Sequence, residues 1–214
     1  MSRKGVITTL AAKEMELPQQ EESLKSKLRI AYANEEITAR QILEVQFAKN
    51  FINAGGKFNY SATHKELIDD LHALCIDNRW KHIYCLENEL KDVFVEHQFK
   101  RSLRDIPLDK SNAGIMFCEW LIADNGMIML APKQSACSRL PIFPDSLIIV
   151  AKPNQMARNI YDALDNFDTL YDGDLPSVID LDKRFKHYED NISQVVLDAT
   201  NTKNVYLFMT DEVI

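Results

Sequence analysis

Two apolar runs stand on either side of the tetrapeptide Ala-Asp-Asn-Gly at residues 123–126, in the stretch FCEWLIADNGMIMLAP. Gly126 has no Cβ and adopts positive φ readily, and the Asp-Asn pair before it favours a turn. The two runs, Leu121–Ala123 and Met127–Leu130, are therefore predicted to be buried strands joined by that turn. This feature constrains the fold most, because it fixes a reversal of the chain inside its most apolar region.

Strand-like and helix-like runs alternate along the rest of the chain. Short apolar runs predict strands, and the helical spacing of Leu67, Leu71 and Leu74 is typical of the helices between them. This alternation favours an α/β fold, a three-layer sandwich with a mixed, largely parallel sheet. The other predicted strands are 58–60, 83–86, 115–118, 147–150, 195–197 and 205–209, the last two completing the sheet, and further helices are predicted from 61–63 and around 90–94.

The N-terminal quarter is rich in Glu, Lys, Gln and Leu, and nothing in it suggests chemistry. One helix is predicted after Pro18, and a second from Thr38 to about Ala54, ended by Gly55 and Gly56. We therefore divide the chain into an N-terminal helical extension, residues 1–56, and an α/β domain, residues 57–214.

Two further predictions concern the region after residue 150. Pro153 introduces a predicted helix from Gln155 to Phe167, with apolar residues on one face. Asp162, Asp165 and Asp168 follow at a spacing of three and resemble a solvated helix surface more than a calcium loop. Residues 168–190 are predicted to be an exposed acidic excursion.

The composition limits the classes of function. The 214 residues include 25 Lys and Arg and 32 Asp and Glu, a net charge of −7. This balance argues against binding to nucleic acid or to an anionic membrane surface. No apolar run approaches the roughly 20 residues that span a bilayer, and the first residues lack the apolar core of a secretory signal. We expect no membrane insertion and a cytoplasmic location.

The cysteine pattern points the same way. Four cysteines lie far apart, and no Cys-x-x-Cys pair is present. This fits a reducing compartment and excludes a closely spaced set of iron–sulfur ligands. The five histidines show none of the helical spacings of a metal site. We therefore predict no metal site and no cofactor.

Glu119 is the strongest candidate for catalysis. A carboxylate at a strand end beside a turn can act as a nucleophile or general base, because the strand fixes its direction and the loop admits substrate. The alternative is an ion pair with a nearby Arg or Lys that fixes the turn. The sequence leaves both interpretations open.

A polar loop follows the third apolar run and offers the best candidate for anion binding. Short polar side chains with two cations could hold a carboxylate or a phosphate, and the alternative is a solvated connection. The candidate ligand-binding residues in this loop are Lys133, Gln134, Ser138 and Arg139.

The order of these parts resembles the core of the lactate-utilisation (LUD) domain family, typified by lactate-utilisation protein C. Asp124 and Gly126 match the Asp and Gly of that family's Asp-Thr-Gly-Thr element, while Asn125 and Met127 replace its two threonines. Arg139-Leu140-Pro141 and the upstream run FAKNFINAGGKFNY are also similar. The family's later glycine-containing segments, Gly-Pro-Ser-x-Thr-Ala-Asp-Ile-Glu and Gly-x-His-Gly-Pro, have no counterpart here.

This resemblance implies a fold similar to that of CoA transferases and ribose-phosphate isomerases. It also adds Asp124, Asn125 and Gly126 to the candidate ligand-binding residues. The alternative is that Asp124 caps backbone N–H groups and Gly126 only forms the turn.

Three functions follow as hypotheses. The resemblance implies an accessory role in oxidation of L-lactate or a related hydroxy acid, beside partners that carry iron–sulfur clusters. A second hypothesis is an enzyme acting on a CoA thioester, a phosphorylated sugar or a similar small anionic metabolite, with Glu119 as nucleophile or base and Arg139 or Lys133 holding the anion. The third is a ligand-binding or assembly module without catalysis. An oligomer is compatible with all three.

Overall fold

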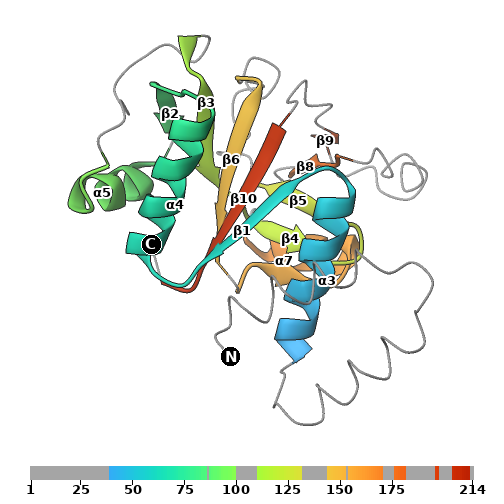
Figure 1. The fold of residues 1–214 in the computed structure, drawn as a ribbon. Helices are drawn as coiled ribbons and strands as arrows, with labels where there is room; N and C mark the ends of the chain where they lie inside the picture. The colour runs from blue at the N-terminus through green and yellow to red at the C-terminus, as the bar shows by residue number, and fades with distance from the viewer. Residues whose placement is uncertain are drawn as a thin grey trace, which may run out of the picture.

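The computed structural model of the chain describes residues 39–85, 87–99, 110–131, 144–152, 154–170, 176–181, 196–197 and 204–212. Within them the predicted α/β architecture with a largely parallel sheet is confirmed (Figure 1). The helices are α3 (Ala39–Asn53), α4 (His64–Asp77), α5 (Asn88–Glu96) and α7 (Ile160–Leu170). The strands are β1 (Lys57–Ser61), β2 (Ile83–Cys85), β3 (Ala113–Phe117), β4 (Trp120–Ile122), β5 (Met127–Leu130), β6 (Ser146–Ala151), β7 (Met156–Ala157), β8 (Ser177–Ile179), β9 (Val196–Leu197) and β10 (Asn204–Thr210).

Five strands form a sheet in which every pairing is parallel, in the order β1-β10-β6-β3-β2. β6 lies at its centre, and all six of its residues are buried. A continuous apolar run such as Leu147–Val150 is what a strand covered on both faces requires. The strands predicted at 58–60, 83–86, 115–118, 147–150 and 205–209 all belong to this sheet.

The remaining strands form a second, mixed sheet in the order β7-β4-β5-β8-β9. β4 and β5 are the antiparallel hairpin predicted around residues 123–126. β7 pairs with β4 in parallel and β8 pairs with β5 antiparallel, so the hairpin lies inside this sheet. The predicted run at 195–197 contains β9, which pairs with β8 here and does not extend the parallel sheet.

The side chains of β6 alternate between two apolar cores. Leu147 and Ile149 join the core that also contains α3 and one face of the second sheet. Ile148 and Val150 join the core that α4 and α5 cover. The layers are therefore α4 with α5, the parallel sheet, and α3 with the second sheet, as Figure 1 shows. α7 covers the outer face of the second sheet.

The helix predicted from residue 38 to about 54 is confirmed as α3. Val45, Ala48 and Phe51 on this helix are buried in the core that it shares with both sheets. Gly55, at φ +94°, follows its end. The domain boundary at residue 56 stays a prediction, and the helix predicted after Pro18 lies outside the described residues. No helix in the described ranges is long and apolar enough to cross a membrane.

Two predictions in the region after residue 150 were wrong. The helix predicted from Gln155 begins only at Ile160, because Met156 and Ala157 form β7 and pair with β4. The side chain of Asn159 accepts hydrogen bonds from the N–H groups of Tyr161 and Asp162, which starts the helix at that point.

The acidic excursion predicted over residues 168–190 is interrupted by β8. Its residues Ser177, Val178 and Ile179 are all buried and pair with β5. The strand was not predicted because its three residues are surrounded by many acidic ones, and the average composition of residues 168–190 is that of an exposed segment.

Candidate functional site

The turn at residues 123–126 is built from backbone geometry. The N–H of Gly126 donates to the carbonyl of Ile122 at 2.9 Å, and Gly126 has φ +70°. A Cβ at this glycine would lie 2.4 Å from the backbone nitrogen of Phe51, on α3. Glycine is therefore required twice here, for the positive φ and for the close approach of the helix.

Polar side chains of α3 bind the turn directly. The Asn50 amide donates to the carbonyls of Ala123 and Asp124 at 2.8 and 3.0 Å. The Gln46 amide donates to the Asp124 carboxylate at 2.8 Å. On its other side, the turn donates two backbone hydrogen bonds. The N–H of Ala123 donates to the carbonyl of Ala157 in β7, and the N–H of Asp124 donates to the carbonyl of Arg158, both at 2.9 Å. The turn thus joins α3 to the start of the α7 segment.

Glu119 lies at the other end of the hairpin from this turn. Its N–H donates to the carbonyl of Met129 at 2.8 Å, and the residue is partly buried. Asp124 lies five positions further along the chain, and five steps of an extended chain span roughly 16 Å. The two carboxylates therefore belong to different places in the fold.

The surroundings of Glu119 are the carboxyl ends of β3 and β6. Gln155 links these two strand ends, because its side chain donates to the Cys118 carbonyl and accepts from the Lys152 N–H. Ligands of α/β proteins commonly bind outside the carboxyl ends of parallel strands. The position of Glu119 is consequently compatible with the catalytic interpretation, which stays a prediction.

The thiols near these strand ends are held neutral. Burial, reinforced by the negative charge of Glu87, raises the pKa of Cys85 to about 12. Burial, with Glu119 as the next cause, also raises the pKa of Cys118 far above its usual range. Neither thiol is poised as a nucleophile, because the thiolate is the reactive form. No group of three metal-ligating side chains is found in the part of the chain that the structure describes.

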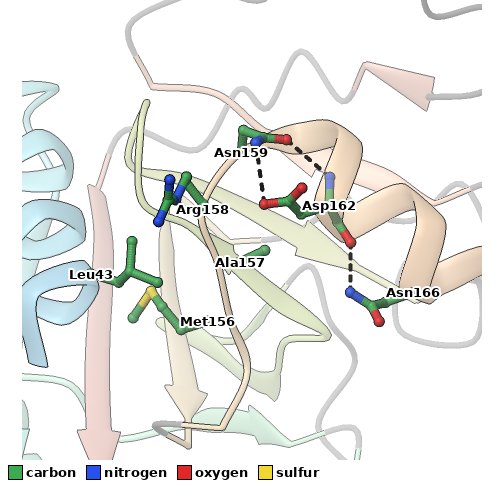
Figure 2. Close-up of a pocket in the computed structure, with 7 residues that line it drawn as sticks. All are labelled: Leu43, Met156, Ala157, Arg158, Asn159, Asp162 and Asn166. Atoms are coloured by element: carbon green, nitrogen blue, oxygen red, sulfur yellow. Dashed lines mark hydrogen bonds between the residues drawn. The ribbon is translucent and has the colours of Figure 1, made fainter. Parts of the chain in front are cut away.

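A pocket of about 560 Å³ lies between α3 and the start of α7 (Figure 2). Its volume is within the range of about 300–1,000 Å³ typical of small-molecule sites. The pocket combines apolar side chains with a cation, a carboxylate and two amides. Its lining residues are Leu43, Met156, Ala157, Arg158, Asn159, Asp162 and Asn166.

Hydrogen bonds hold the polar wall of this pocket in one arrangement. Asn159 donates to the Asp162 carboxylate at 3.2 Å while its own oxygen caps α7. Asn166 donates to the Asp162 carbonyl at 2.6 Å. The Arg158 side chain is exposed beside this wall, and in the described part of the chain no carboxylate forms an ion pair with it. Figure 2 shows Arg158 between Leu43 and Asp162.

Comparison with known proteins identifies the family. The profile of the LUD domain matches residues 20–176, which is most of the chain. The chain belongs to the LUD domain family. This confirms the predicted membership of the family, which is associated with lactate utilisation in general.

The fold agrees with this assignment. The crystal structure of a DUF162 family protein from Deinococcus radiodurans matches with a TM-score of 0.59 and 13% identity, over 81% of this chain and 99% of that chain. At that identity the similarity shows the fold. A search of curated proteins finds no significant match.

In this LUD domain, the predicted site residues do not form one cluster. Asp124, Asn125 and Gly126 lie together in the turn, and Glu119 lies apart from them. The ligand-binding residues predicted at 133, 134, 138 and 139 lie outside the described residues. Asp162 was predicted to be a solvated helix residue; it is exposed and also lines the pocket.

The sequence analysis missed the pocket. Arg158, Asn159 and Asn166 drew no attention, because the segment was taken as the interior of a helix. One signal was available: Asn159, with Asp162 three residues later, is typical of a helix start. The opposite wall, Leu43, is more than a hundred residues away, and no local pattern indicates that contact.

Proposed function

We propose that this LUD-domain protein is an accessory component in the oxidation of L-lactate or a related 2-hydroxy acid, acting in the cytoplasm beside partners that carry iron–sulfur clusters. Membership of the LUD family is the observation that carries this proposal. Oxidation of a hydroxy acid releases two electrons, and the partner subunits would supply the acceptor. The role of this chain would be to bind those subunits or to hold the acid.

Two features of the fold support an accessory role over an independent enzyme. The turn at residues 123–126 is occupied by structural contacts, since the Asp124 carboxylate accepts from Gln46 and the turn carbonyls accept from Asn50. The neutral thiols of Cys85 and Cys118 are unsuited to nucleophilic chemistry.

The test is co-purification of the full chain from its native cells grown on lactate. We expect it to carry with it proteins that contain iron and acid-labile sulfide, and we expect its deletion to slow lactate oxidation. Isolation of the chain without any cluster-bearing protein, together with unchanged lactate oxidation in the deletion strain, would contradict the proposal.

Glu119→Gln separates the accessory role from catalysis by this chain. The substitution keeps the side-chain shape and removes the nucleophilic carboxylate, so an accessory protein should still support lactate oxidation at the normal rate in the deletion strain. A loss of several orders of magnitude, in a variant whose thermal unfolding midpoint is unchanged, would instead assign catalysis to Glu119.

The pocket favours a second candidate, a ligand-binding module for a small anionic metabolite. A site of about 560 Å³ with an exposed arginine is suited to a carboxylate or a phosphate. A thermal-shift panel of hydroxy acids, phosphorylated sugars and CoA esters tests this candidate without any partner. A ligand at about 100 times its dissociation constant should stabilise the fold by about 2.7 kcal/mol.

A further inference from the structure

The pocket between α3 and α7 is lined by two opposite charges, those of Arg158 and Asp162. Arg158 lies directly before Asn159, and Asp162 lies one helical turn after it. Both line the same pocket, as Figure 2 shows: Asp162 lies on α7, and Arg158 lies two residues before that helix. Neither forms an ion pair with another charged group that the structure describes. A ligand that satisfies both groups needs a carboxylate and a hydrogen-bond donor.

The two polar groups are pre-organised differently. Asp162 is fixed, because one of its oxygens accepts from Asn159 and its carbonyl accepts from Asn166. Its other carboxylate oxygen can accept a further hydrogen bond from a ligand hydroxyl or amine. Arg158 offers a planar guanidinium, which suits bidentate binding of a carboxylate.

The opposite side of the pocket is apolar. Leu43 on α3 and Met156 on β7 are both partly buried and pack against the main core. Ala157, between Met156 and Arg158, is buried and also lines the pocket. An aliphatic substituent of a ligand would therefore lose contact with water on this side.

We propose that this pocket binds a small carboxylic acid that carries a hydroxyl or amino group on carbon 2 and an aliphatic side chain. The carboxylate binds Arg158, the carbon-2 donor binds Asp162, and the side chain lies against Leu43 and Met156. This inference deepens the ligand-binding role and rests on the proposed function for its choice of 2-hydroxy acids as the first probes. A hydroxyl and an amino group on carbon 2 would both donate to Asp162, so the pocket is expected to accept 2-hydroxy acids and 2-amino acids by the same contacts.

The experiment uses the full chain labelled with ¹³C at the methionine methyl groups. Met156 reports on the pocket, and Met129, which is buried in the core under α7, reports on the integrity of the fold. Titrations compare 2-hydroxy-4-methylpentanoate, leucine and 4-methylpentanoate, which lacks the donor. We expect the Met156 signal to shift with a dissociation constant of about 1 mM or tighter, as is reasonable for a ligand of this size.

Three results are expected together. The compound that lacks the donor should bind about tenfold more weakly than the better of the other two. Arg158→Ala should weaken binding about 10- to 100-fold, whereas Lys81→Ala, which removes the same charge near β2, should change it less than about twofold. Asp162→Ala should remove the advantage of the carbon-2 donor, so that the affinity ratio falls to about one.

Any of three outcomes would overturn the proposal: no shift of Met156 with either donor-bearing compound, equal binding of 4-methylpentanoate, or equal effects of Arg158→Ala and Lys81→Ala. A preference for the hydroxy acid supports the link to lactate-like substrates, and a preference for leucine supports the pocket while contradicting that link. Partner binding plays no part in this titration. If the titration fails and cluster-bearing proteins still co-purify with the chain, the pocket proposal alone is refuted. If the titration succeeds while no cluster-bearing protein co-purifies and deletion leaves lactate oxidation unchanged, the accessory role alone is refuted.

Discussion

Gly126→Ala is the substitution that tests the turn most directly. A Cβ at this position would lie 2.4 Å from the Phe51 backbone nitrogen and 2.7 Å from the Asn50 carbonyl carbon. These are backbone atoms of α3, which cannot rotate aside as the end of a side chain can. The residue also has φ +70°, where an alanine is strained.

The magnitude follows from those two terms. The left-handed conformation costs an alanine about 1–2 kcal/mol, and forcing an extra methyl group into a packed contact costs about 1–3 kcal/mol. Gly126→Ala should therefore lower the free energy of unfolding by about 2–5 kcal/mol. For a domain of this size that corresponds to a decrease of about 4–20 °C in Tm.

Gly55→Ala is the matched control. Gly55 also has positive φ, at +94°, but nothing lies within 4 Å of a Cβ placed there. The Gly55→Ala variant should therefore lose only the backbone-strain contribution, about 1–2 kcal/mol of the free energy of unfolding. Urea unfolding of both variants, with m-values compared to that of the parent chain, measures the difference. Equal losses in the two variants would refute the close packing of α3 on the turn.

Two further predictions concern single side chains. Asn50→Ala leaves the Ala123 carbonyl without its 2.8 Å partner and should cost about 1–3 kcal/mol, whereas Asn53→Ala on the exposed side of the same helix should cost less than about 0.5 kcal/mol; equal costs would argue against the contact. Cys85, with a pKa of about 12 when folded and about 9.0 when unfolded, keeps its proton in the native state where the unfolded chain loses it, so stability falls as pH rises above about 9. Between about pH 8 and pH 10 this loss is roughly 1.4 kcal/mol for one thiol, and Cys85→Ala should remove it from the pH dependence of urea unfolding under reducing conditions. An unchanged alkaline slope would contradict burial of the thiol.

The central sheet could be predicted from the sequence because burial on two faces leaves a local signature. The run Leu147–Val150 is apolar at every position, and a strand between two cores needs no polar side chain. The turn at residues 123–126 could also be predicted from the sequence, because a glycine after Asp124 and Asn125 is typical of a turn that needs positive φ. Each of these elements is specified by neighbouring residues.

Other elements could not be predicted from local sequence patterns, because the residues that they pair with are distant in the sequence. Met156 and Ala157 form a strand only because β4 offers its free edge, and the spacing of Met156, Ile160 and Leu164 is also that of a helix. β8 is three residues long and depends on pairing with β5. The pocket needs Leu43 opposite Arg158, a contact that no periodicity contains.

The turn and the pocket are mechanically connected, which yields a last prediction. α3 carries both Phe51, which meets Gly126, and Leu43, which lines the pocket about 12 Å further along the helix. The turn also donates from the Asp124 N–H to the carbonyl of Arg158. A displaced α3 would therefore move one wall of the pocket relative to the other.

We accordingly expect Gly126→Ala to shift the Met156 methyl signal and to weaken binding of the best carboxylic acid by about tenfold or more, because misplacing one of several ligand contacts loses most of its contribution. Gly55→Ala should leave both unchanged, since its Cβ meets no atom and its strain is confined to the residues after α3. The comparison has to be made well below the midpoint of unfolding, with the Met129 signal confirming a folded core. If Gly126→Ala destabilises the protein and the Met156 signal and affinity stay constant, α3 does not transmit the position of the turn, and the two sites are independent features of the LUD domain.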